Sequence, residues 1–181
     1  MSGGTYFSAT DTQVLDLVFT AINQRLGNQY VAVYERPEEI APSDTPVISI
    51  AVDVSLSMDI DPSTGNGDYR LDKVKNLLHT FVQQTPEPSL MQLISFSNDV
   101  QVEQVFTHRK SEITQALGEL KARGGTNILQ STELTYQSLD NIPSNKKVIV
   151  YITDAALAVE DKNKEYFESL LAGIKDDGVI V

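Results

Sequence analysis

Two nearly unbroken apolar runs stand apart from the rest of the chain. They are "VISIAVD" at 47–53 and "KKVIVYITD" at 146–154, and each is about as long as one strand. A strand that is apolar on both faces is typical of a buried, mostly parallel sheet. The pattern therefore predicts two central strands, each of which ends in an aspartate, Asp53 and Asp154.

Apolar residues spaced three and four apart predict amphipathic helices around these runs. The first helix is capped at Thr10 or Asp11 and closed by Gly27, and further helices are predicted at 71–82, 113–120, 128–139 and 166–174. "LMQLISF" and "VQVEQVF", joined by "SND", predict a hairpin. This alternation predicts an α/β domain with three layers, in which a mostly parallel central sheet has helices on both faces.

The first 46 residues form a prelude to that domain. Their helix is followed by a predicted strand at 29–35 and then by "RPEEIAPSDTP", whose three prolines indicate an ordered linker. We therefore divide the chain into an N-terminal helix-strand extension with its linker, 1–46, and an α/β domain, 47–181.

Composition narrows the classes of partner. The 181 residues carry 25 Asp and Glu against 14 Lys and Arg, a formal net charge of -11, which argues against nucleic-acid binding. The absence of cysteine excludes disulfides and thiolate metal sites and favours a reducing compartment. Neither a signal peptide nor an apolar run of about 20 residues is present, so we expect a cytoplasmic protein without membrane contact.

The loop after the first apolar run combines one carboxylate with two hydroxyls. Asp53, Ser55 and Ser57 occupy alternate positions, and alternate side chains of an extended segment point to the same side. Hard cations such as Mg2+ prefer oxygen ligands and bind through only one or two carboxylates. "RGGTN" adds the hydroxyl of Thr126, and "ITDA" adds Asp154 from the second strand. The ends of parallel strands meet at one edge of a sheet, where such folds bind ligands.

These residues resemble the metal-ion-dependent adhesion site (MIDAS) of the von Willebrand factor A (vWA) domains. In that family the site is Asp-x-Ser-x-Ser, then Thr, then Asp, and this chain has "DVSLS", "GGTN" and "TDA" in the same order. The resemblance covers about residues 46–181. It implies a Rossmann-like fold that usually finishes with a further helix and strand, so we expect a truncated chain or a fold without that ending.

The resemblance also implies a function. Ser55, Ser57 and Thr126 would bind one Mg2+ or Mn2+ through their hydroxyls, while Asp53 and Asp154 would hold its waters or bind it directly. The remaining coordination position would take a carboxylate from a protein partner. The chain would then be a metal-dependent interaction module and not an enzyme. Intracellular relatives often serve assemblies that contain AAA+ ATPases, which makes such an assembly the expected setting.

Two positions depart from the family pattern. Members often have glycine between the two serines and after the last aspartate, where this chain has Leu56 and Ala155. Neither position supplies a ligand, so metal binding is still expected, although the shape of the loops could differ.

An enzymatic alternative is a Mg2+-dependent phosphatase resembling the haloacid dehalogenase superfamily. Asp53 would be its nucleophile, and Lys146 with the pair Asp176 and Asp177 would complete the site. That family needs a second aspartate two residues after the first as its general acid. Ser55 stands there instead, and a serine hydroxyl cannot donate a proton at neutral pH as a carboxylic acid does. We therefore favour the interaction module.

Overall fold

The computed structural model describes residues 19–21, 23–24, 44–59, 70–140, 142–154 and 163–181. Within these ranges four strands form one sheet in the order β3-β2-β1-β4. The strands are β1 (Val47–Asp53), β2 (Leu90–Phe96), β3 (Val100–Thr107) and β4 (Lys147–Ile152). β1 runs parallel to both β2 and β4, whereas β2 and β3 form the antiparallel hairpin that the sequence predicts.

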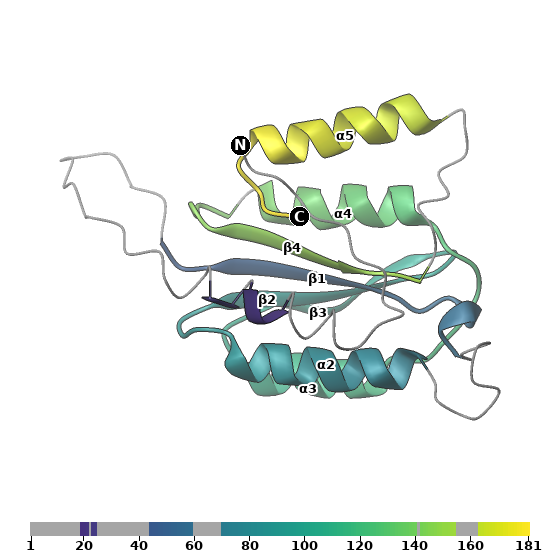
Figure 1. Cartoon of the computed structure of the whole chain (residues 1–181), viewed down its shortest axis with the longest axis horizontal. Coiled ribbons are helices and arrows are strands. Elements are labelled where there is room, and N and C mark those ends of the chain that lie inside the picture. Colours follow the sequence, from purple (N-terminus) through teal and green to yellow (C-terminus); the bar gives the residue numbers. More distant parts are fainter. Residues whose placement is uncertain (1–18, 22, 25–43, 60–69, 141, 155–162) are drawn as a thin grey trace.

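Helices cover both faces of this sheet. α2 (Arg70–Gln84) and α3 (Lys110–Glu119) lie on one face, and α4 (Ile128–Asp140) and α5 (Lys164–Asp176) lie on the other (Figure 1). A single turn of 3-10 helix, η1 (Leu56–Met58), follows β1. The predicted α/β class with a mostly parallel sheet between two helical layers is confirmed.

The side chains of β1 alternate between the two helical layers. Ile48, Ile50 and Val52 pack in the cluster that contains the apolar residues of α2 and α3. Val47 and Ala51 face the other way, into the clusters that hold the apolar residues of α4 and α5. All seven residues of the strand are buried, which is why its sequence reads as an unbroken apolar run. The core therefore fixes the end of β1 firmly in place.

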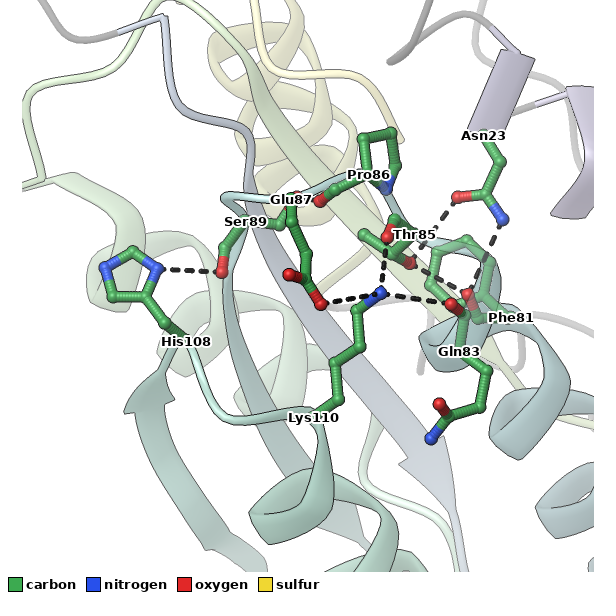
Figure 2. A network of polar contacts seen from close by, with 9 residues as sticks. All are labelled: Asn23, Phe81, Gln83, Thr85, Pro86, Glu87, Ser89, His108 and Lys110. Carbon is green, nitrogen blue, oxygen red and sulfur yellow. Dashed lines mark hydrogen bonds and ion pairs between the residues drawn. The ribbon is translucent and has the colours of Figure 1, made fainter.

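The end of α2 is held by a lysine from α3. Lys110 donates from Nζ to the carbonyls of Gln83 at 3.0 Å and Thr85 at 2.7 Å, and pairs with Glu87 at 3.3 Å (Figure 2). A cation is favourable at a helix C-terminus because the last carbonyls have no partner within the helix. This network lies at the edge where β2 begins, away from the predicted metal site.

Several predictions fall largely outside the described residues. Residues 19–21 and 23–24, in the first predicted helix, are helical, and Phe19 is buried against Phe81 with ring centroids 4.9 Å apart. The strand predicted at 29–35 and the linker after it lie outside the described residues. At the other end, Ile180 forms an isolated parallel bridge with Val148, beside β4. No helix in the described part of the chain is long and apolar enough to cross a membrane.

Candidate metal centre

Asp53 is the most buried member of the predicted set. It ends β1 with no exposed surface, and Oδ1 accepts a hydrogen bond from the backbone N–H of Ser55 at 2.8 Å. Oδ2 accepts from the hydroxyl of Thr153 at 2.5 Å. Thr153 follows β4, which pairs with β1 residue by residue up to Val52 and Ile152. The parallel register therefore brings the two predicted loops together.

Ser55, Ser57 and Asp154 form a continuous row of oxygen atoms. Ser55 Oγ lies 2.9 Å from Ser57 Oγ, and the Ser57 hydroxyl donates to Asp154 Oδ1 at 2.9 Å. Ser57 and Asp154 are 97 residues apart in the sequence. The structure thus brings together three of the five predicted ligands, and Asp53 is linked to them through the hydrogen bond that it accepts from the Ser55 backbone N–H.

Thr126 lies in a loop that is tied to the Asp-x-Ser-x-Ser loop. The Leu56 N–H donates to the carbonyl of Gly124 at 3.1 Å, and the Arg123 N–H donates to the carbonyl of Val54. On the other side, the Asn127 N–H donates to Ser97 at the end of β2. Thr126 itself is exposed between these fixed points. These bonds hold the loop that carries Thr126 beside the serine loop, at the carboxyl ends of β1 and β2.

Burial raises the pKa of the Asp53 carboxyl above its ordinary value. Hydrogen bonds from Thr153 and Ser55 oppose this shift, and the nearby charge of Asp154 adds to it. A pKa raised in this way means that the carboxylate has lost solvation and lies near a second negative charge, and both effects disfavour its charged form. A bound cation would offset both effects.

The donor set matches the chemistry of Mg2+. Mg2+ takes oxygen ligands in an octahedron and usually keeps several waters. The Ser55, Ser57 and Asp154 oxygens are joined to one another by hydrogen bonds of 2.9 Å. Within the described residues no group of three or more His, Asp or Glu gathers to hold a metal. A metal bound at this position would therefore need hydroxyl ligands as well as carboxylates.

The first departure from the family motif has a simple structural basis. The side chain of Leu56 is 60% exposed, and the loop uses the backbone of this residue, whose N–H donates to Gly124 and whose carbonyl accepts from the Asp59 N–H. A side chain that points to solvent leaves the positions of both neighbouring serines unaffected. Leucine therefore replaces glycine here without disturbing the row of oxygens, while Ala155 lies outside the described residues.

The sequence reasoning missed three residues of the site. Arg70, at the start of α2, donates to Asp154 Oδ2 in an ion pair, and Thr153 holds Asp53. Asn98, in the hairpin turn, accepts a hydrogen bond from the N–H of Gly125 at 2.8 Å through its side-chain oxygen. Only Thr153 carried a signal, because it stands beside Asp154 in the motif.

The phosphatase alternative is not supported. Lys147 pairs with Val47 at the beginning of β1, so Lys146 lies at the opposite end of the sheet from Asp53. Asp177 follows the last residue of α5 and stands three residues before Ile180, which bonds to Lys147 and Ile149 at that same end. Six residues of strand separate the two ends, or about 20 Å. The residues that this enzyme would need are therefore not brought together.

A buried parallel strand pair, helices on both faces and a hydroxyl-rich loop cluster at the carboxyl ends define a vWA-type α/β domain. The family model for the von Willebrand factor type A domain matches residues 48–156. The chain therefore belongs to the von Willebrand factor type A family. No curated protein matches it.

Solved structures show the same fold. BatB, a conserved hypothetical protein from Bacteroides thetaiotaomicron, is 22% identical over 74% of this chain and 63% of its own, with a TM-score of 0.57. The SpRpn10 VWA domain is 18% identical over 75% of this chain and 71% of its own, with a TM-score of 0.54. The vWF domain of the type V pili tip protein Mfa5 from Porphyromonas gingivalis is 18% identical over 66% of this chain and 43% of its own, with a TM-score of 0.54. The chain thus spans slightly less than two thirds of BatB.

Proposed function

We propose that this domain is a metal-dependent protein interaction module. It binds one Mg2+, with Mn2+ as an alternative, through the hydroxyls of Ser55, Ser57 and Thr126. Asp53 and Asp154 hold the waters of the ion or bind it directly. The ion then binds an acidic side chain of a protein partner, and the domain itself carries out no reaction.

The gathering of oxygens from Ser55, Ser57 and Asp154 at the carboxyl ends of two parallel strands carries this proposal. A set rich in hydroxyls neutralises little of the charge of the ion, which leaves the ion able to attract an external carboxylate. The residues that would surround it come from the ends of two parallel strands and from the loop before α4. Membership of the vWA family, in which interaction modules are common, adds support.

A partner with an exposed Asp or Glu fits this site better than a basic one. Binding would be reversible and lost on chelation, because the bond between metal and carboxylate anchors the complex. The surrounding loops would supply specificity. An assembly that contains an AAA+ ATPase remains our suggestion for the setting.

Capture of partners from the native source tests the docking function. Three baits are compared: the wild-type chain with Mg2+, the wild-type chain with EDTA, and Asp53→Ala with Mg2+. We expect the wild type to retain a protein with Mg2+ that neither of the other two baits retains. Equal recovery on all three baits would refute docking through the metal.

A further inference from the structure

Asp154 is shared between the oxygen row and an arginine. Its Oδ1 accepts from the Ser57 hydroxyl at 2.9 Å, and its Oδ2 is bound by an NH group of Arg70. The side chains of Arg70 and Asp154 are only 18% and 3% exposed. This ion pair is therefore largely shielded from water, and its partners are 84 residues apart in the sequence.

Two buried carboxylates at one site need a counter-charge. Asp53 has no exposed surface, and it is linked to Asp154 through Ser55 and Ser57. Uncompensated carboxylates in such a place are costly, and removing one partner of a buried ion pair commonly destabilises a protein strongly. Without a metal, Arg70 supplies a positive charge to this pair of acids.

We propose that Arg70 is a built-in counter-cation that stabilises the metal-free site and lowers its affinity for a divalent ion. This inference rests on the proposed metal site and adds its regulation. Arg70 contacts the Oδ2 atom of Asp154, whereas Oδ1 faces the serine row, so the arginine can remain in place when an ion enters. Its charge then repels the ion.

Removal of that charge has two opposite consequences. The metal-free protein loses stability, because Asp154 loses its cation. The affinity for Mg2+ rises, because repulsion disappears and the ion becomes the main counter-charge. Interactions between charges a few ångströms apart near a protein surface are large enough that we expect at least about a tenfold rise.

Calorimetric titration with MgCl2 at constant ionic strength tests the inference, together with the unfolding temperature in EDTA and in Mg2+. Arg70→Gln removes the charge and keeps a hydrogen-bond donor, and Arg70→Met is a second neutral variant if the first does not fold. Both should bind Mg2+ at least about tenfold more tightly than the wild type. In EDTA, both variants should unfold at a lower temperature than the wild type. Mg2+ should raise their unfolding temperature by more than it raises that of the wild type.

Two variants serve as controls. Arg70→Lys keeps the charge and should bind Mg2+ with nearly wild-type affinity. Arg109→Gln removes an arginine that pairs with Glu112 at 2.7 Å near the other end of the sheet, and should leave Mg2+ affinity unchanged. Unchanged or weaker Mg2+ binding by the neutral Arg70 variants would overturn the inference. A wild type that binds neither Mg2+ nor Mn2+ would instead overturn the proposed metal site.

Discussion

Gly125 illustrates how tightly individual residues are fitted around the oxygen row. A Cβ atom built at this position would lie 2.6 Å from the side-chain oxygen of Asn98, the same atom that accepts the Gly125 N–H. The glycine therefore allows a close approach, and any larger residue would require the Asn98 side chain to shift. Through this contact the hairpin turn positions the loop that carries Thr126.

Replacement of Gly125 by alanine should disturb that contact. We expect Gly125→Ala to lower the free energy of unfolding by about 1–3 kcal/mol, because Asn98 has to move and its hydrogen bond is strained. Gly118→Ala is the matched control, because nothing lies within 4 Å of its added Cβ on α3. It should stabilise the chain by about 0.5–1 kcal/mol. Urea unfolding measures both, and an equal response of the two variants would contradict the role given to Gly125.

The clustering of the candidate ligands was predictable from the sequence, whereas the residues that support them were not. Asp53 ends one apolar strand and is followed by Ser55 and Ser57, and Asp154 follows another apolar strand. Their spacing is that of the family motif, so the sequence alone identifies them. Arg70 and Asn98 belong to no motif. Their contacts join residues 84 and 27 positions apart, and only the folded chain brings them together. Whether the five predicted ligands bind a metal stays a prediction.

At the scale of elements, helix and strand positions followed from apolar periodicity. The strand at 90–96 and the helix at 128–139 were predicted within a residue of β2 and α4. Helix ends were less predictable, because polar contacts determine them. The helix α3 begins three residues before Ile113, the first of the apolar residues that predicted it, and Lys110 in its first turn also holds the end of α2.

Lys110 of α3 bonds to the end of α2, and its replacement should weaken the packing of the two helices. Its side chain is 16% exposed, so its bonds to the carbonyls of Gln83 and Thr85 are shielded from water. We expect Lys110→Met to lower the free energy of unfolding by about 1–3 kcal/mol. Arg109→Met is the neighbouring control, because Arg109 is 78% exposed and an ion pair so open to water contributes little to stability. Similar losses in both variants would show that Lys110 has no special role.

The start of α3 should respond to pH. A hydrogen bond from the Thr107 hydroxyl, at 2.7 Å, and another from Arg109 lower the pKa of Glu112 below 4.5. A lowered pKa contributes stability above pH 4.5, and this contribution is lost as the pH falls through the value in the folded protein. Thr107→Val should therefore raise the pKa of Glu112. The variant should be less stable than the wild type at neutral pH, and this difference should become smaller in acid.

Two measurements test this response between neutral pH and about pH 3. They are the carboxyl chemical shift of Glu112 and the free energy of unfolding. Thr114→Val is the control, because its hydroxyl donates to the carbonyl of Ser111 and not to Glu112. Its effect on stability should not depend on pH. A Glu112 pKa that is the same in wild type and Thr107→Val would contradict the assignment.

For the whole molecule, the parallel register explains why distant motifs form one site. β1 lies between β2 and β4, so the chain segments that follow all three strands meet at one edge (Figure 1). The same register separates Asp53 from Lys146, so the residues that the phosphatase alternative requires are not brought together. The order of strands was not predictable in detail, because apolar runs say which strands are buried and not which are neighbours.

The central claim is that Asp53 belongs to a metal site. Titration calorimetry of Mg2+ into the wild type and into Asp53→Asn tests it most directly. Because asparagine has the same shape and no charge, Asp53→Asn should fold and unfold at a similar or higher temperature in EDTA. We predict that the wild type binds one Mg2+ and that Asp53→Asn binds it at least about tenfold more weakly. Absence of binding to the wild type, or equal binding to both, would contradict the account.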